Sequence, residues 1–160
     1  MKQPANSQNV TAVPEGFHTV TPYLIVENAD ELLEFIKTGL HGEVTFMYRT
    51  EDNKVSHATV KIGDSMIMVS DTMSDMEPEL AMLYLYVDDV DAVYQSALAA
   101  KGESIQEPKD QFYGDRAGAV KDRWGNKWWI ATHTENVDQE ELKRRAEEAK
   151  RKQRQEAPTH

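Results

Sequence analysis

Segments with the hydrophobic pattern of a β-strand alternate with segments with the pattern of an α-helix along this chain. The same order of segments occurs twice. Residues from Thr19 to Glu27 are dense in β-branched and aromatic types, which predicts a strand. Asn28 with Glu31 three residues later is typical of a capping box, and apolar residues then recur at three- and four-residue spacing, which predicts a helix up to residue 40. Three short strands are expected next, at Val44–Thr50, Val55–Ile62 and Ser65–Ser70.

The second half of the chain predicts the same elements again. A strand is expected at Met82–Val87 and a helix at Asp89–Lys101, followed by strands at Glu103–Glu107, Tyr113–Asp122 and Lys127–Thr132. A shift of 61 residues places Tyr23 on Tyr84, and a shift of 62 places Ile67 on Trp129. The repeat indicates an internal duplication of a βαβββ unit, an α+β arrangement; chance similarity of two amphipathic units is the alternative.

The two ends of the chain differ from this repeat. Residues 1–17 are polar and contain two prolines, which indicates a flexible lead-in. Residues 138–160 form a charged tail whose helix, expected at Asp138–Gln155, has too few apolar residues to be buried. It is interpreted as a solvated extension or a minor contact to a partner subunit. We therefore divide the chain into a flexible lead-in (residues 1–17), a single domain (18–137, with units 18–71 and 81–137) and a charged tail (138–160).

Composition narrows the classes of partner. The net charge of −10 should repel a phosphate backbone, so no nucleic-acid partner is expected, and a cationic or neutral ligand suits the charge better. The simpler interpretation, which we favour, is that the charge only keeps the protein in solution. The absence of cysteine excludes disulfides and favours a reducing compartment, the cytoplasm. No apolar run is long enough for a membrane span, and no signal peptide is expected.

Several segments resemble a known superfamily. Paired βαβββ units are similar to the vicinal oxygen chelate superfamily of glyoxalases, bleomycin-resistance proteins and dioxygenases. Five segments resemble its PhnB-like branch, namely TVTPYL from Thr19, SHA from Ser56, IGDS from Ile62, DQFYGDRAG from Asp110 and ATHTE from Ala131. The resemblance implies a cup-shaped mixed sheet in which the two units face a shared cavity. It also implies a homodimer, in some members with units exchanged between chains.

The resemblance also locates the usual metal ligands of the superfamily. In this chain those positions fall on Thr21, Ile67, Met82 and Trp129. None of these is a usual ligand for a divalent transition metal, so no cofactor is expected. The alternative is a divalent metal at a relocated site, for which the candidates are His57, Asp71, His133 and Glu135.

Strand alternation predicts what lines the cavity, because residues i and i+2 share a face. The face opposite the helices should carry Ile67, Val69 and Asp71 in the first unit and Trp129, Ala131 and His133 in the second. The hairpin at Gln111–Asn136 should form one wall of the site, and Ser56–Asp71 the facing wall. The predicted ligand-binding residues are Tyr23, His57, Tyr84, Tyr86, Tyr113, Asp115, Arg116, Trp129 and His133.

The alternatives for these residues are structural. The rings can simply fill a core. Arg116 can either clamp a carboxylate or phosphate of a ligand or, with Asp115, pair with strand neighbours and pin the loop over the pocket. His133 and Glu135 are the candidates for catalysis, His133 as a general base. Three functions remain open: a small-molecule-binding protein without the usual metal, a superfamily metalloenzyme (lyase, dioxygenase or isomerase-like) with a relocated site, and a structural or partner-binding homodimer.

Overall fold

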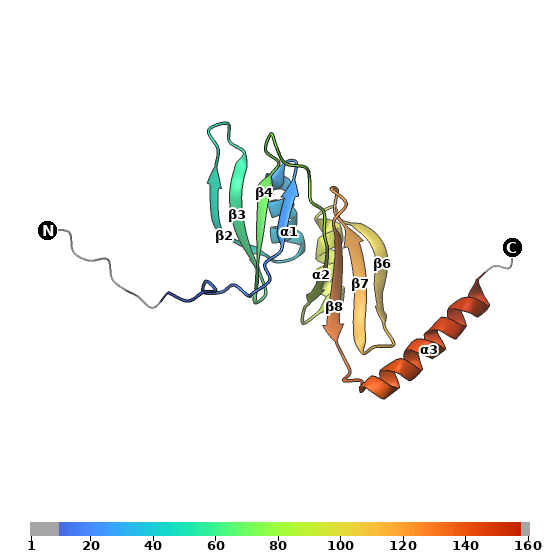
Figure 1. Cartoon of the computed structure of the whole chain (residues 1–160). Coiled ribbons are helices and arrows are strands. Elements are labelled where there is room, and N and C mark those ends of the chain that lie inside the picture. The colour runs from blue at the N-terminus through green and yellow to red at the C-terminus, as the bar shows by residue number, and fades with distance from the viewer. Residues whose placement is uncertain (1–9, 158–160) are drawn as a thin grey trace.

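The structure, a computed structural model, describes residues 10–157 and contains two βαβββ units followed by a single helix (Figure 1). Predictions for residues 1–9 of the lead-in and 158–160 of the tail lie outside the described residues. The first unit comprises β1 (Tyr23–Val26), α1 (Ala29–Gly39), β2 (Glu43–Arg49), β3 (Val55–Ile62) and β4 (Ser65–Asp71). The second comprises β5 (Met82–Tyr86), α2 (Val90–Ala99), β6 (Glu103–Asp110), β7 (Asp115–Lys121) and β8 (Lys127–His133), and α3 spans Gln139–Glu156.

Each unit forms its own four-stranded mixed sheet. The strand orders are β1-β4-β3-β2 and β5-β8-β7-β6, so β1 and β5 occupy equivalent edge positions. In each sheet the first strand runs parallel to the last, and the remaining pairs are antiparallel. The predicted α+β class with tandem βαβββ units is therefore confirmed.

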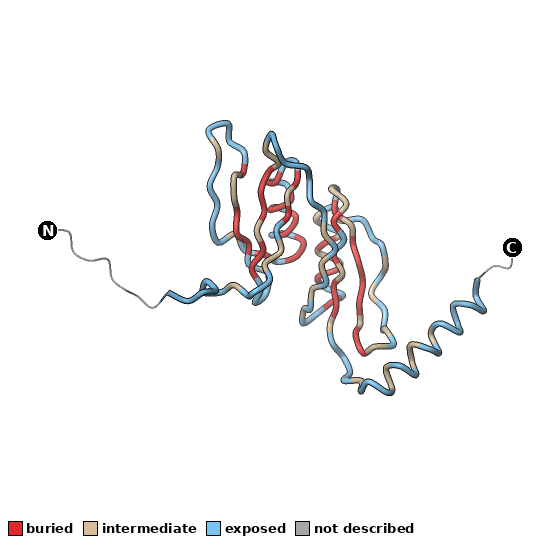
Figure 2. Tube along the Cα trace, viewed as in Figure 1, coloured by how far each residue is buried: buried red, intermediate tan, exposed pale blue. Residues whose placement is uncertain are grey.

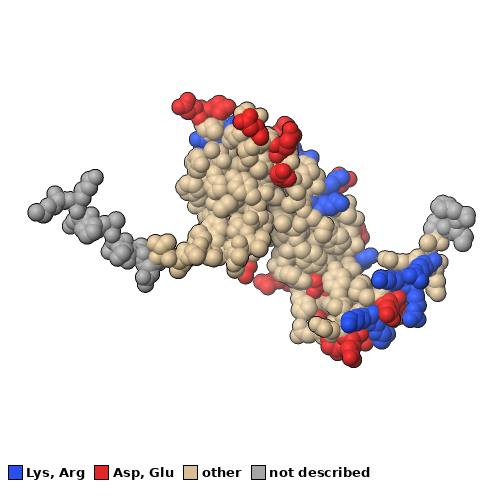
Figure 3. Space-filling model, in the orientation of Figure 1, with Lys and Arg blue, Asp and Glu red and all other residues tan. Residues whose placement is uncertain are grey.

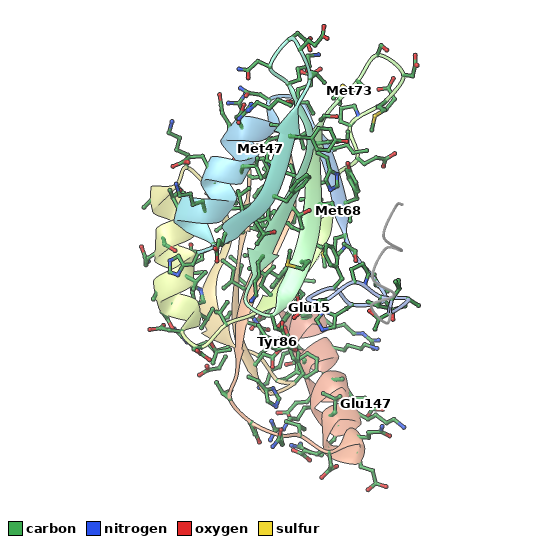
Figure 4. All side chains as sticks on the ribbon, turned by 90° about the vertical axis from the view of Figure 1, so that its left-hand side faces the viewer. Glu15, Met47, Met68, Met73, Tyr86 and Glu147 are labelled. Atoms are coloured by element: carbon green, nitrogen blue, oxygen red, sulfur yellow. The ribbon has the colours of Figure 1, made fainter. Side chains whose placement is uncertain are left out.

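The helices of the two units lie next to each other on one side of both sheets (Figures 1 and 4). Small residues permit this approach: a Cβ atom added at Gly39 would lie 3.0 Å from the Cβ atom of Ala100. The hydroxyl of Ser96 also donates to the carbonyl oxygen of Gly39 at 2.6 Å. Phe35 of α1 contacts Trp128 of β8, with ring centroids 6.2 Å apart. The helices and the covered sheet faces thus share one hydrophobic core (Figure 2).

The start of α1 is stabilised differently from the prediction. Asn28 adopts a left-handed conformation (φ 64°), and its side chain donates to Glu31 at 2.7 Å instead of capping a backbone N–H group. The buried carboxylate of Asp71 accepts from the N–H group of Ala29 at 2.8 Å and from that of Val55 at 2.7 Å. The predicted capping box is wrong, because a residue at the end of β4 satisfies the first N–H group of the helix.

One predicted strand face is also wrong. Ile67, Val69 and Asp71 point into the core, and the residues between them point to the open side of the sheet. Tyr23 lies opposite Met68 and Tyr84 lies opposite Trp129, so Met68 is the counterpart of Trp129. Eight residues (60–67) separate Thr59 from its partner Met68, and nine (120–128) separate Ala119 from its partner Trp129. Because of this extra residue, an alignment on the turn glycines shifts β4 by one position.

The C-terminal helix α3 extends away from both sheets (Figure 1). It begins as predicted at Asp138, whose side chain accepts from the N–H group of Glu141 at 2.9 Å. Arg145 fixes its first half to the body by donating to Glu135 at 2.8 Å and to the carbonyl oxygen of Phe112 at 3.2 Å. Among residues 10–157, no helix is both long enough and apolar enough to cross a membrane.

Candidate functional site

The sheet faces turned away from the helices are open and carry few charges. In Figure 3 this side is turned toward the viewer, and Lys, Arg, Asp and Glu gather at its edges and along α3. Figure 4 shows Tyr86 on this side of the strands, opposite the helices. Large hydrophobic side chains on the two sheets remain exposed there, among them Phe46, Tyr48, Met82 and Tyr86. Exposed large hydrophobic side chains on one face are typical of a binding surface.

A buried carboxylate organises the open face of the second sheet. Asp115, which is 2% exposed, accepts hydrogen bonds at Oδ2 from the hydroxyls of Tyr84 and Tyr86, both at 2.9 Å. Its Oδ1 accepts from Nδ1 of His133 at 2.8 Å. Tyr84 also contacts the hydroxyl of Tyr113 at 3.2 Å, and its ring is nearly parallel to that of Trp129, with centroids 6.3 Å apart. We call Tyr84, Tyr86, Tyr113, Asp115, Trp129 and His133 the second-sheet cluster.

The backbone brings this cluster together through one tight turn. Gly114 has φ 94°, and its carbonyl oxygen accepts from the N–H groups of Thr134 and Glu135. A side chain at Gly114 would collide with the carbonyl of Glu135, so the close approach requires glycine. The turn places Asp115 directly opposite His133 in the antiparallel pairing of β7 and β8.

The hydrogen bonds of the cluster alter its protonation. Burial of Asp115 opposes ionisation, but the bonds from His133, Tyr84 and Tyr86 outweigh it and lower the pKa of Asp115. The bond to Asp115 raises the pKa of His133, and burial is the largest cause of the raised pKa of Tyr84. The ionised carboxylate of Asp115 and the amide oxygen Oδ1 of Asn136, 2.8 Å from Nε2, can both only accept, so both ring nitrogens of His133 donate, as in a protonated imidazole.

The open face of the first sheet carries a smaller aromatic group. The hydroxyl of Tyr23 contacts Nδ1 of His57 at 3.1 Å, and the rings of Phe46 and Tyr48 lie 6.5 and 6.2 Å from that of His57. We call these four residues the first-sheet cluster. Sequence reasoning missed Phe46 and Tyr48, although their i,i+2 spacing on β2 indicates a shared face.

Within one chain the two clusters do not meet. Among residues 10–157, no hydrogen bond or ring contact links the first-sheet cluster to the second-sheet cluster. A cleft of about 940 Å³ lies at the junction of the units, between the turn joining β3 to β4, strand β5 and the start of α2. Of the predicted ligand-binding residues, only Tyr84 and Tyr86 line this cleft.

Three other candidates from the sequence are engaged elsewhere. Arg116 points to the helix side and forms two bonds of 2.8 Å with Asp91 of α2. Glu135 pairs with Arg145 of α3, and the carboxylate of Asp71 is used by backbone N–H groups. The four candidates for a relocated metal are therefore not brought together. In the described part of the chain, no three His, Cys, Asp or Glu side chains are grouped closely enough to hold a metal ion.

The positions that the resemblance assigns to the superfamily's metal ligands carry poor donors. With the register of β4 corrected, they are Thr21, Met68, Met82 and Trp129. A thioether is a soft ligand, an indole is not a ligand, and the Thr21 hydroxyl bonds to the carbonyl oxygen of His18 at 3.3 Å. These side chains do not fit a divalent metal that requires imidazole or carboxylate ligands.

Comparisons with other proteins place the chain in a family. An uncharacterized protein of Mycobacterium bovis, Mb0911c, is 27% identical over 134 residues, which cover 77% of this chain and 88% of that protein. The crystal structure of protein PA1353 from Pseudomonas aeruginosa matches with a TM-score of 0.59 and 23% identity, covering 72% of this chain and 98% of that one. The PhnB protein from Bacillus cereus matches with a TM-score of 0.56 and 19% identity, covering 72% and 99%.

These structural likenesses concern the fold, and the PhnB match agrees with the segments that resemble the PhnB-like branch. A sequence model of one family matches residues 16–130, which contain both units up to the middle of β8. The chain belongs to the Glyoxalase/Bleomycin resistance protein/Dioxygenase superfamily.

Proposed function

We propose that this protein binds a small organic molecule on the open aromatic faces of its sheets, without the divalent metal of the superfamily's enzymes. The observation that carries the proposal is the second-sheet cluster, in which partly exposed rings surround the buried carboxylate of Asp115. Ligand sites are usually built in this way, from apolar and aromatic surface with a few well-placed polar groups.

The donor chemistry supports binding without a metal. Thr21, Met68, Met82 and Trp129 replace the imidazole and carboxylate ligands that a divalent metal requires. The cluster contains one side chain suited to proton transfer, His133, but its two ring nitrogens bond to Asp115 and Asn136, and the described residues place no hydroxyl nucleophile within hydrogen-bond distance of it. Binding is therefore proposed as the primary function, ahead of catalysis.

Two measurements test this proposal. Protein purified without a chelator or affinity tag should contain far less than one divalent transition-metal ion per chain by elemental analysis. Titration with 1-naphthol, a neutral planar probe, should show saturable binding, which Trp129→Ala should weaken about three- to tenfold through lost stacking. Trp124→Ala is the matched control, because Trp124 lies in the turn and donates to the carbonyl oxygen of Glu27. One tightly bound metal ion per chain, or equal losses in both variants, would contradict the proposal.

We further propose that the binding unit is a homodimer, in which the first-sheet cluster of one chain faces the second-sheet cluster of the other. Support comes from the separation of the two clusters within one chain. It also comes from exposed hydrophobic side chains on both open faces, including Phe46 (55% exposed) and Met82 (65% exposed). Exposed apolar side chains gathered on one face commonly mark a protein–protein interaction site.

Charges placed on the open faces should prevent this association. Phe46→Lys and Met82→Lys are each expected to convert the dimer to a monomer in sedimentation velocity, because burying an unpaired ammonium group at an interface is costly. Gln95→Lys, on the exposed surface of α2, introduces the same charge away from both faces and should leave the dimer intact. A monomeric wild-type protein at micromolar concentration would refute the dimer but not the ligand-binding proposal.

A further inference from the structure

We infer that the second-sheet cluster selects an organic cation, a substituted ammonium group attached to an apolar body. This inference rests on the proposed small-molecule function and specifies the class of ligand. It follows from three features of the cluster: ring faces that remain open, a buried negative charge bonded to two of those rings, and the engagement of nearby cationic side chains elsewhere.

The open rings provide the surface for a cation. Tyr84 is 38% exposed and Tyr86 is 65% exposed, and their ring centroids lie 5.3 Å apart at an angle of 54°. Trp129 continues this surface on the neighbouring strand, nearly parallel to Tyr84. Aromatic faces carry a negative potential, so several rings at an angle to one another form a favourable environment for a substituted ammonium group.

The buried carboxylate strengthens this potential. Asp115 accepts at the same oxygen from the hydroxyls of Tyr84 and Tyr86, so its charge lies at the hydroxyl ends of both rings. A phenol that donates to a carboxylate becomes more electron-rich, because hydrogen bonds polarise the groups that they join. Burial of Asp115 keeps water from screening this charge as strongly as it would at the surface.

The one cationic side chain of the second-sheet cluster is already paired. Both ring nitrogens of His133 face acceptors, Oδ1 of Asp115 and Oδ1 of Asn136, so the positive charge of a protonated His133 is held by its ion pair with Asp115. The nearest arginines are engaged elsewhere: Arg116 with Asp91 on the helix side, and Arg145 with Glu135 and Glu141. The net charge of the whole chain, −10, favours the same class of ligand.

Three probes of nearly equal size and shape test the inference. Choline, its uncharged carbon analogue 3,3-dimethylbutanol and the anion 3,3-dimethylbutanoate are titrated into the full-length protein. The indole N–H signal of Trp129 is followed by NMR. Choline should bind about tenfold more tightly than the neutral analogue, and the anion should bind more weakly than both.

Two matched carboxylate variants locate the effect. Asp115→Asn should reduce the affinity for choline to about that of 3,3-dimethylbutanol. Asp91→Asn removes one negative charge as well, but on α2, where Asp91 pairs with Arg116 on the helix side of the sheet. This variant should keep the preference for choline over 3,3-dimethylbutanol within about twofold of the wild-type value. If Asp115→Asn does not fold, Tyr86→Leu, which removes an exposed ring, should reduce the preference for choline in its place.

Each outcome distinguishes this inference from the broader proposal. Equal binding of choline and 3,3-dimethylbutanol, a preference for the anion, or equal losses in Asp115→Asn and Asp91→Asn would overturn cation selection. Absence of any Trp129 shift with all three probes would also overturn it. In each case the 1-naphthol titration still decides separately whether the protein binds small molecules.

Discussion

Replacement of Asp122 by alanine should lower the free energy of unfolding by about 3–5 kcal/mol. Asp122 is 3% exposed and lies at the start of the turn between β7 and β8. Its Oδ1 accepts from the N–H groups of Trp124 at 3.0 Å and Asn126 at 2.9 Å. Its Oδ2 accepts from the side-chain amide of Asn126 and from the indole N–H group of Trp128, both at 2.9 Å.

The loss is large because the donors left behind are themselves buried. Asn126 is 1% exposed and Trp128 is fully buried, so water cannot replace the carboxylate without opening the core. Chemical denaturation of Asp122→Ala, compared with Asp64→Ala, measures the effect. Asp64 lies in the equivalent turn of the first unit, is exposed and accepts a hydrogen bond from the hydroxyl of its neighbour Ser65, so its variant should change stability by less than about 0.5 kcal/mol. Similar losses in the two variants would refute this role of Asp122.

Asp71→Ala should cost about 2–4 kcal/mol of folding stability. Asp71 was a candidate for a relocated metal site, but its two oxygens accept from the N–H groups of Ala29 and Val55, which are both fully buried. Removing the carboxylate leaves the first N–H group of α1 and the first of β3 without a partner. Elemental analysis of the variant should give the same metal content as the wild type.

The second unit offers an internal control for this prediction. Thr132 of β8 stabilises the start of α2 as Asp71 stabilises the start of α1. Its hydroxyl oxygen accepts from the N–H group of Val90, the first residue of α2, at 3.0 Å. Thr132→Val keeps the volume of the side chain and loses two uncharged bonds, the one from Val90 and the one that the hydroxyl donates to the carbonyl oxygen of Val87 at 2.9 Å. It should therefore cost about 1–2 kcal/mol in the same denaturation experiment. A smaller loss for Asp71→Ala than for Thr132→Val would contradict the structural role assigned to Asp71.

The fold was largely predictable because its signals are local. The change between strand and helix periodicity, repeated once, predicted both units and every helix and strand to within a few residues. The failures occurred where a distant contact decided the outcome. Asn28 satisfied the local rule for a helix cap, but Asp71, from the end of β4, supplies the acceptor. The extra residue in the second turn shifted the inferred face of β4, because alternation reverses when an alignment slips by one position.

The aromatic candidates were identifiable from the alternation of residues along the strands, but their grouping was not. Tyr84, Tyr86, Trp129 and His133 share a face as predicted, and Asp115 joins them through the pairing of β7 with β8. Arg116, its neighbour in the chain, points to the opposite side and pairs with α2. Phe46 and Tyr48 were missed because β2 was not considered as part of the open face.

The sequence by itself determined the two units, the family resemblance and the poor metal-ligand character of the expected positions, because these depend on residue types and short spacings. Only the tertiary structure decided that the candidate residues form two separate clusters, that Asp115 is buried beneath Tyr84 and Tyr86, and that Asp71 stabilises a helix. The physical reason is that hydrogen bonds between strands and packing between helices join residues tens of positions apart. Such pairings depend on the register and orientation of whole elements, which no local pattern of residues specifies.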